Sequence, residues 1–164
     1  MNFTWDWNEW FMVITSVAAT SLFLLIRKSF PTVLIIAIWV YITTMVATAD
    51  YFIAATPFKL YYCADNTSYE PTATMIHVFT YPPFAFFLLY FYERWKLRGV
   101  RLWIYIAVWS VFSAFFEWIN VVNGVFTYTG WKLLYSVPVY LLSQVLLIYL
   151  YRNLRNWLDE PIPA

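Results

Sequence analysis

Five apolar runs, each about as long as a bilayer-spanning helix, dominate this sequence and limit what it can fold into. A transmembrane helix needs about 20 apolar residues, with a range of about 17–25. The runs cover residues 10–26, 32–55, 76–92, 102–122 and 133–151. Pro31 suits the start of the second run, because a helix start leaves that N–H unpaired anyway. We therefore predict an all-α, polytopic membrane helix bundle with five transmembrane helices, forming a single domain over residues 1–164.

The composition excludes a soluble domain. The chain is 63% hydrophobic and only 12% charged, whereas soluble domains carry about 25% charged residues. A soluble chain of 164 residues cannot bury that much apolar surface in one core. The net charge of +1 gives no reason to expect nucleic acid as a partner. The lipid bilayer is the predicted partner, and a membrane protein partner or a homo-oligomer stays open.

The basic residues predict an orientation. With the N-terminus out and the C-terminus in, the inner loops hold eight of the ten Lys and Arg residues, and only Lys59 and Lys132 lie outside. Inner loops of membrane proteins are enriched in Lys and Arg, so we predict N-out and C-in. Tryptophans near the ends of the runs, Trp131 among them, are predicted to be interfacial anchors.

Glu117 is a carboxylate near the end of the fourth run, where contact between its charge and lipid would cost free energy. On insertion scales, a charged side chain at the bilayer centre costs about 2.5–3.5 kcal/mol. Ser110, Ser113 and Asn120 are spaced from Glu117 so that all four share one helix face, which we predict to point into the bundle. Counted from Leu102, Glu117 lies about 22 Å along the helix, in the outer third of a core about 30 Å thick.

Two other ionisable groups fall at a similar depth: Asp50 in the second run and His77 in the third, with Tyr81 one turn after His77. The fifth run adds Ser136, Tyr140 and Ser143 on one helix face, with Gln144 beside it. Helices that each bury a polar stripe can share it at the centre of a bundle. We therefore predict a polar pocket near the outer face that binds a ligand or ion. Its predicted residues are Glu117, His77, Asp50, Asn120, Ser113, Tyr81, Tyr140 and Gln144.

Two prolines interrupt the third run just after His77. Pro82-Pro83 cannot donate to the carbonyls of Val78 and Phe79, and proline inside a helix also kinks it. Proline is common in membrane helices, so a simple kink explains this break. Discontinuous helices also form binding sites in transporters, which leaves a functional role open.

No catalytic, metal or cofactor motif accompanies the polar residues. His77, Asp50 and Glu117 are a plausible ligand set for zinc or iron, but they lie in three distant segments without a local motif. We therefore predict no metal site. The three glycines form neither GxGxxG nor a P-loop, and the single Cys63 excludes an intramolecular disulfide. No cofactor and no catalytic residue are predicted.

Three short segments carry a family resemblance: "TYPP", then "FE" near the end of the fourth run, then "TYTGWKLLYS". They resemble an uncharacterised family of small multi-pass membrane proteins from Gram-positive bacteria. The likeness covers roughly residues 50–152 and rests on Tyr81-Pro82, Glu117, Tyr128, Gly130-Trp131 and Ser136. It implies a bacterial plasma (inner) membrane and a shared helical architecture, and it brings no assigned activity. Residues 120–132 are interpreted as an extended or re-entrant segment at the outer interface that can cover the pocket.

Three functions follow from these predictions. The leading one is a non-enzymatic membrane protein that binds a protein partner, an amphiphile or an ion through the outer pocket. The second is a small transporter or proton-coupled channel that uses Glu117 as its titrating group. The third is a membrane enzyme acting on a lipid or isoprenoid, with Glu117 and His77 as acid and base.

Overall fold

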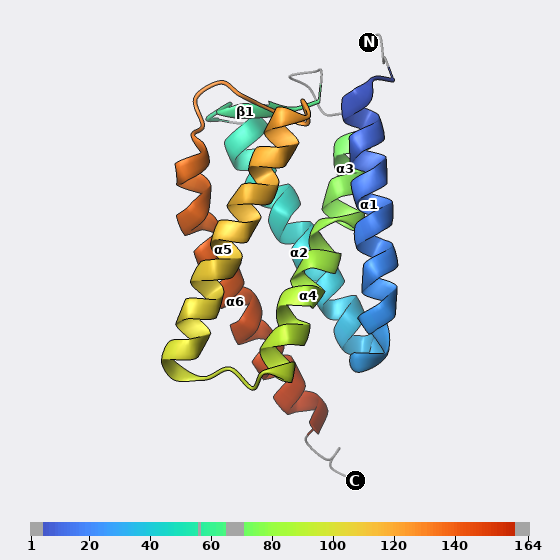
Figure 1. Cartoon of the computed structure of the whole chain (residues 1–164), viewed down its shortest axis with the longest axis vertical. Helices are drawn as coiled ribbons and strands as arrows, with labels where there is room; N and C mark the ends of the chain where they lie inside the picture. The colour runs from blue at the N-terminus through green and yellow to red at the C-terminus, as the bar shows by residue number, and fades with distance from the viewer. Residues whose placement is uncertain (1–4, 56, 65–70, 160–164) are drawn as a thin grey trace.

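The computed structural model describes residues 5–55, 57–64 and 71–159, and these form a bundle with five helical spans (Figure 1). The elements are α1 (Trp7–Ile26), η1 (Arg27–Ser29), α2 (Thr32–Asp50), η2 (Tyr51–Ala55), β1 (Tyr61–Cys63), α3 (Pro71–Phe79), α4 (Tyr81–Arg94), α5 (Gly99–Val122), β2 (Phe126–Tyr128) and α6 (Leu133–Asp159). Stretches long and apolar enough to cross a membrane are Trp7–Ser29, Thr32–Ala54, Thr74–Arg94, Gly99–Val122 and Leu133–Leu158. The predicted five-span membrane bundle is confirmed, and four of the spans extend a few residues beyond the predicted ends.

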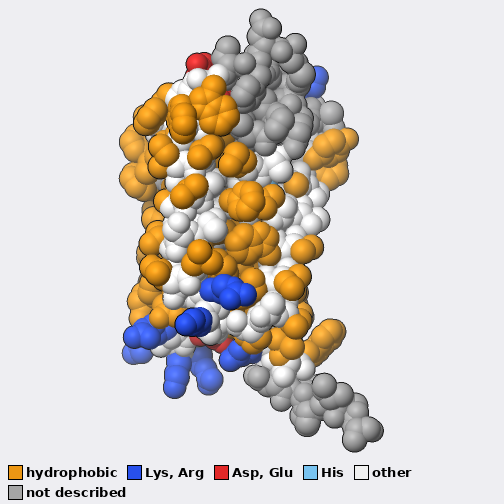
Figure 2. Space-filling model, turned by 90° about the vertical axis from the view of Figure 1, so that its right-hand side faces the viewer, with side chains coloured by type: hydrophobic (Ala, Val, Ile, Leu, Met, Phe, Trp, Pro, Cys, Tyr) orange, Lys and Arg blue, Asp and Glu red, His pale blue; other side chains and the backbone are white. Residues whose placement is uncertain are grey.

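The two ends of the bundle differ in chemistry. The chain begins at one end and finishes at the other, as an odd number of spans requires (Figure 1). Lys and Arg side chains gather at the end that holds η1 and the α4–α5 loop, which we call the basic end (Figure 2). The opposite end carries β1 and β2, and we call it the sheet end. This separation is the one that the N-out, C-in prediction requires, and the side of the membrane that each end faces stays a prediction.

Large apolar side chains cover the flank of the bundle between its two ends (Figure 2). Leu25 is 79% exposed, Val33 64% and Leu134 76%. An apolar surface this extensive marks contact with other apolar matter rather than with water. The lateral surface therefore fits a lipid environment.

The interior divides into two packed regions. Near the basic end, Phe86 of α4 is fully buried and its ring lies against those of Phe23, Phe30 and Trp39. Near the sheet end, a smaller cluster surrounds Met12 of α1. α1 packs mainly on α3 and α4, and α5 packs mainly along α6. The helices thus form two groups, α1–α4 and α5–α6.

The predicted kink in the third span is confirmed as a break between α3 and α4 at Thr80. Pro82-Pro83 lies in the first turn of α4, where missing N–H groups cost least. The Phe79 carbonyl, which Pro83 leaves without a helical donor, accepts a hydrogen bond of 3.0 Å from the Thr20 hydroxyl of α1. Ser16 of α1 and Thr80 share a buried hydrogen bond of 2.9 Å. The broken backbone is therefore stabilised by hydroxyl groups of α1, as an apolar environment demands.

The segment that follows α5 forms a strand. β2 pairs antiparallel with β1, so that Cys63 lies opposite Phe126. The backbone N–H groups of Thr129, Gly130 and Trp131 all converge on the Leu60 carbonyl at 2.9 Å. A Cβ on Gly130 would lie only 3.0 Å from the Leu60 side chain, so glycine allows this close approach. Residues 60–63 and 126–131 are thereby joined into one layer over the bundle, which we call the cap.

Candidate functional site

A cavity of about 180 Å³ lies between α2, α4, α5 and α6, beneath the cap at the sheet end. Its walls are mostly apolar and aromatic, with Ile42 and Met45 from α2, Phe84 from α4 and Phe112 from α5 among them. Its polar lining residues are Asp50, Tyr61, Tyr81, Ser113, Glu117, Asn120, Tyr128, Ser136, Tyr140, Ser143 and Gln144. An apolar pocket with a few convergent polar groups is the usual form of a small-molecule site.

Long side chains bridge the two helix groups at the cavity. Phe84 of α4 reaches across to Phe112 and Phe116 of α5, with ring centroids 6.0 and 4.8 Å away. Farther toward the basic end, the Tyr105 hydroxyl of α5 donates to the Leu88 carbonyl of α4 at 2.7 Å. These bridges hold α4 and α5 together while leaving room between their backbones.

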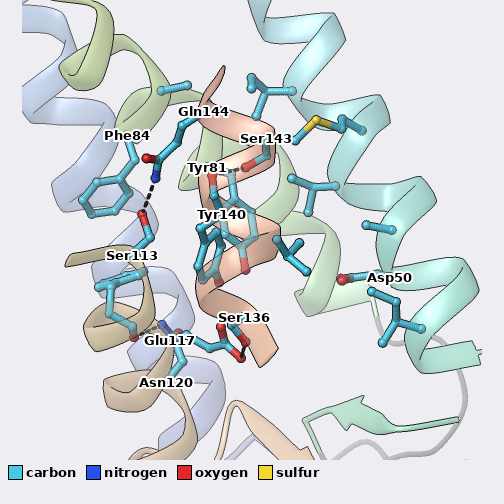
Figure 3. Close-up of a pocket in the computed structure, with 18 of the residues that line it drawn as sticks. Asp50, Tyr81, Phe84, Ser113, Glu117, Asn120, Ser136, Tyr140, Ser143 and Gln144 are labelled. Carbon is cyan, nitrogen blue, oxygen red and sulfur yellow. Dashed lines mark hydrogen bonds between the residues drawn. The ribbon is translucent and has the colours of Figure 1, made fainter. Parts of the chain in front are cut away.

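Glu117 is the carboxylate at the centre of the polar lining, and it is only 8% exposed. Its Oε1 accepts hydrogen bonds from the hydroxyls of Tyr128 and Ser136, the latter at 2.8 Å. The Trp131 indole N–H donates to the Ser136 oxygen at 2.8 Å. An indole N–H can only donate, so the single Ser136 proton is left for Glu117. The network therefore presents Glu117 as an acceptor and ties α5, α6 and β2 to one atom. Ser136 lies beside Glu117 in Figure 3.

A second network joins α5 to α6 deeper in the bundle. The Ser110 hydroxyl donates to Oε1 of Gln144 at 3.0 Å. Nε2 of Gln144 donates to the Ser113 oxygen at 3.2 Å (Figure 3). Ser110 is 1% exposed and Gln144 is 6% exposed. The polar stripe of α5 is thus matched by a polar stripe on α6, and the predicted inward orientation of this face is confirmed.

Asp50 lies on the opposite wall, at the end of α2 (Figure 3). Its Oδ2 lies 2.6 Å from Nε2 of His77, and its Oδ1 accepts a hydrogen bond from the Tyr61 hydroxyl. The π-helical turn η2 begins directly after Asp50. Turns of this kind occur often at functional sites. Asp50 therefore connects α2, α3 and β1.

The two tyrosines of the cap are held in their protonated form. Burial, and then the neighbouring Asp50 carboxylate, raise the pKa of the Tyr61 hydroxyl well above its usual value. Burial also raises the pKa of Tyr128, and its hydrogen bond to Glu117 adds to the rise. Both hydroxyls consequently remain donors to carboxylates across the ordinary pH range.

Asn120 has an unusual hydrogen-bonding state. It lines the cavity, is 2% exposed and follows Glu117 by one helical turn. Its Nδ2 donates to the Phe116 carbonyl at 2.7 Å. Its Oδ1 is buried and accepts no hydrogen bond from any residue that the structure describes. An acceptor in this state carries a desolvation cost that a donor could remove.

The structure brings most of the predicted site residues together. Seven of the eight line the cavity: Asp50, Tyr81, Ser113, Glu117, Asn120, Tyr140 and Gln144. His77 is the exception, because it is not among the lining residues. Its Nε2 instead contacts the Asp50 carboxylate. Asp50 and Glu117 occupy the same cavity. Within the described ranges, however, no group of three His, Cys, Asp or Glu side chains is arranged to hold a metal ion.

Sequence reasoning predicted that residues 120–132 can cover the pocket, but it did not predict which side chains of the cap line the cavity. Tyr61, Tyr128 and Trp131 all line the cavity, although they precede or follow the helices. Trp131, predicted to be an interfacial anchor, donates to Ser136. The only available signal was the extended character of residues 120–132, which gave no partner strand. Ser136 was placed on the correct stripe of α6, but its bond to Glu117 depends on how α5 and α6 pack.

Comparison with known proteins gives no assignment. No protein-family model, no curated protein and no solved structure shows a significant match to the chain.

Proposed function

We propose that this multi-pass membrane protein binds an amphiphile, without catalysis, in the cavity between α2, α4, α5 and α6. The observation that carries the proposal is the asymmetry of the cavity. Its walls are apolar helices, and its carboxylates and tyrosines gather beneath the cap. An amphiphile matches both parts, because its tail can replace lipid along the walls while its headgroup meets the polar end. The positive-inside pattern and the family resemblance support a bacterial plasma membrane as the location.

The same lining argues for an amphiphile over a bare ion. A metal ion needs several oxygen, nitrogen or sulfur ligands around it. Among the described residues, no group of three His, Cys, Asp or Glu side chains is arranged to supply such ligands. The large apolar part of the wall would also serve no purpose for an ion.

The lining also argues against the predicted acid–base chemistry. Glu117 faces the cavity, whereas His77 is held against Asp50 and is not a lining residue. A general acid or base must come within hydrogen-bonding reach of the reacting atom. Binding therefore explains the arrangement better than turnover of a lipid or isoprenoid.

Binding is tested with four dodecyl probes: dodecylamine, dodecyltrimethylammonium, dodecanol and dodecyl sulfate. Equilibrium dialysis of each radiolabelled probe against protein in phosphatidylcholine nanodiscs, with empty nanodiscs subtracted, measures binding beyond partition into lipid. At least one probe should bind saturably. Ala49→Phe, which fills the cavity from α2, should abolish that binding. Ala47→Phe, at an exposed position of the same helix, is the matched control. Absence of any saturable binding, or equal binding to both variants, would refute the proposal.

Proton-coupled transport is the second candidate, and the break at Thr80 favours it. The break lies next to Tyr81, which lines the cavity, and discontinuous helices in transporters form substrate sites. In proteoliposomes with an imposed pH gradient and an internal pH dye, the protein should then dissipate the gradient. Glu117→Gln should stop this flux, and Glu93→Gln at the basic end should not. Unchanged flux in Glu117→Gln excludes this function.

A further inference from the structure

The charge balance of the cavity is negative. Its lining includes the carboxylates Asp50 and Glu117, and no Lys, Arg or His lines it within the described part of the chain. Lys59 and Lys132 belong to the sheet end, but both are exposed and neither lines the cavity. A buried negative charge is costly unless a positive charge or several hydrogen bonds compensate it.

The two carboxylates are compensated differently. Asp50 lies 2.6 Å from His77, which can carry a positive charge. Glu117 has hydroxyl partners, Tyr128, Ser136 and Tyr140, and no ion pair with any described residue. The bonds from Tyr128 and Ser136 both reach Oε1. Glu117 is therefore the carboxylate whose charge the protein leaves for a ligand to balance.

Asn120 provides a second unsatisfied polar group, one helical turn after Glu117. Its buried Oδ1 lacks a donor, and its position one turn after Glu117 puts both side chains on the same face of α5. A group that offers several N–H donors and a positive charge would satisfy Glu117 and Asn120 together. A primary ammonium has three such donors.

Aromatic rings complete the surroundings of this position. Tyr61, Tyr81, Tyr128, Trp131 and Tyr140 line the cavity beside the carboxylates. Tyr81 and Tyr140 lie between Glu117 and Asp50 in the view of Figure 3. The faces of aromatic rings attract cations, and the attraction is strongest where water is excluded. The polar end of the cavity thus offers negative charge, the unsatisfied Asn120 acceptor and aromatic faces.

We propose that the ligand is a cationic amphiphile with a primary ammonium headgroup, bound between Glu117 and Asn120 with its alkyl chain along the apolar walls of the cavity. This inference rests on the proposed amphiphile binding and adds the charge of the headgroup. It excludes anionic amphiphiles, because nothing in the lining can balance a sulfate, phosphate or carboxylate. It also excludes zwitterionic phospholipids as preferred ligands, since their phosphate would enter the same negative environment.

The headgroup series on the wild-type protein tests this inference. The four dodecyl probes share one chain and differ only in the headgroup, so their ranking isolates the polar end. Dodecylamine, protonated at pH 7, should bind at least about tenfold more tightly than dodecanol, because charge-assisted hydrogen bonds are worth about one decade in affinity or more. Dodecyl sulfate should show no saturable binding. Dodecyltrimethylammonium, which is charged but has no N–H donor, should fall between dodecylamine and dodecanol.

Two variants locate the headgroup. Glu117→Gln keeps the side-chain shape and an oxygen acceptor for Tyr128 and Ser136, and it should remove the advantage of dodecylamine over dodecanol. Glu93→Gln makes the same change at the basic end, where Glu93 pairs with Arg155, and it should leave the ranking intact. Asn120→Leu should weaken dodecylamine several-fold and leave dodecyltrimethylammonium unchanged.

The outcomes separate this inference from the proposed function. If dodecanol binds as tightly as dodecylamine and Ala49→Phe abolishes both, amphiphile binding stands and the ammonium inference is overturned. An equal loss of dodecylamine affinity in Glu117→Gln and Glu93→Gln also overturns it, because the effect is then one of net charge. If no probe binds saturably, both proposals fail. Should Glu117→Gln fail to fold, the wild-type ranking and Asn120→Leu decide the question.

Discussion

Ser136→Ala is the substitution whose effect on stability follows most directly from the structure. Ser136 is 3% exposed and stands between two side chains. Its hydroxyl donates to Oε1 of Glu117 at 2.8 Å and accepts from the indole of Trp131 at 2.8 Å. Alanine removes both hydrogen bonds and leaves the indole N–H without this acceptor. The change therefore acts on α5, α6 and the segment after β2 at once.

The expected cost comes from the two bonds taken separately. A hydrogen bond to a charged group contributes about 1.5–3 kcal/mol and a neutral one about 0.5–1.5 kcal/mol. Hydrogen bonds between membrane helices fall at the lower end of such ranges, because the unfolded chain in the membrane also finds partners. We expect Ser136→Ala to lower the free energy of unfolding by about 2 kcal/mol.

The assay is reversible unfolding in mixed micelles as the mole fraction of SDS rises. Ser143→Ala is the matched control, because Ser143 lines the same cavity from the same helix and its hydroxyl donates only to the Tyr140 carbonyl of its own helix among the described contacts. Such local bonds contribute little, so the control should change stability by less than about 0.5 kcal/mol. The Glu117→Gln, Ser136→Ala double variant should lower the free energy of unfolding by less than the sum of the losses in the two single variants.

Equal destabilisation by Ser136→Ala and Ser143→Ala would refute this reasoning. It would mean that loss of any hydroxyl from the cavity face of α6 has the same effect, and that the network around Glu117 contributes nothing specific. Full additivity in the double variant would contradict the shared bond between Ser136 and Glu117 in the same way.

Three further predictions concern the break, the cap and the orientation. Thr20→Val, which removes the donor to the Phe79 carbonyl, should cost about 1 kcal/mol of unfolding free energy in the same SDS assay. Above about pH 10 the unfolded chain loses the Tyr128 proton while the native structure keeps it, so stability should fall as the pH rises, and Tyr128→Phe should make this fall shallower. A cysteine placed at Lys96 in a Cys63→Ser background should resist a membrane-impermeant maleimide in intact cells and react after lysis; labelling in intact cells would reverse the predicted orientation.

The burial of Glu117 was predictable, and its partners were not all predictable. The i, i+3, i+4 spacing of polar residues in α5 and α6 marks one face of each helix, and lipid makes the opposite orientation costly. The same reasoning placed Asp50 and Tyr81 in the cavity. It also predicted His77 as a site residue, and that role stays a prediction. His77 is not among the lining residues and lies 2.6 Å from Asp50, because depth along a helix does not give the direction of a side chain around it.

By itself the sequence determined five helices long and apolar enough to cross a membrane, since a helix satisfies the backbone of an apolar run within the run itself. It determined as well which helix faces turn inward, because a period of 3.6 residues follows from local geometry. Only the tertiary structure decided that β1 meets β2, and that Tyr128 and Ser136 converge on one oxygen of Glu117. Those contacts join segments far apart in the chain, and their geometry depends on how the helices cross.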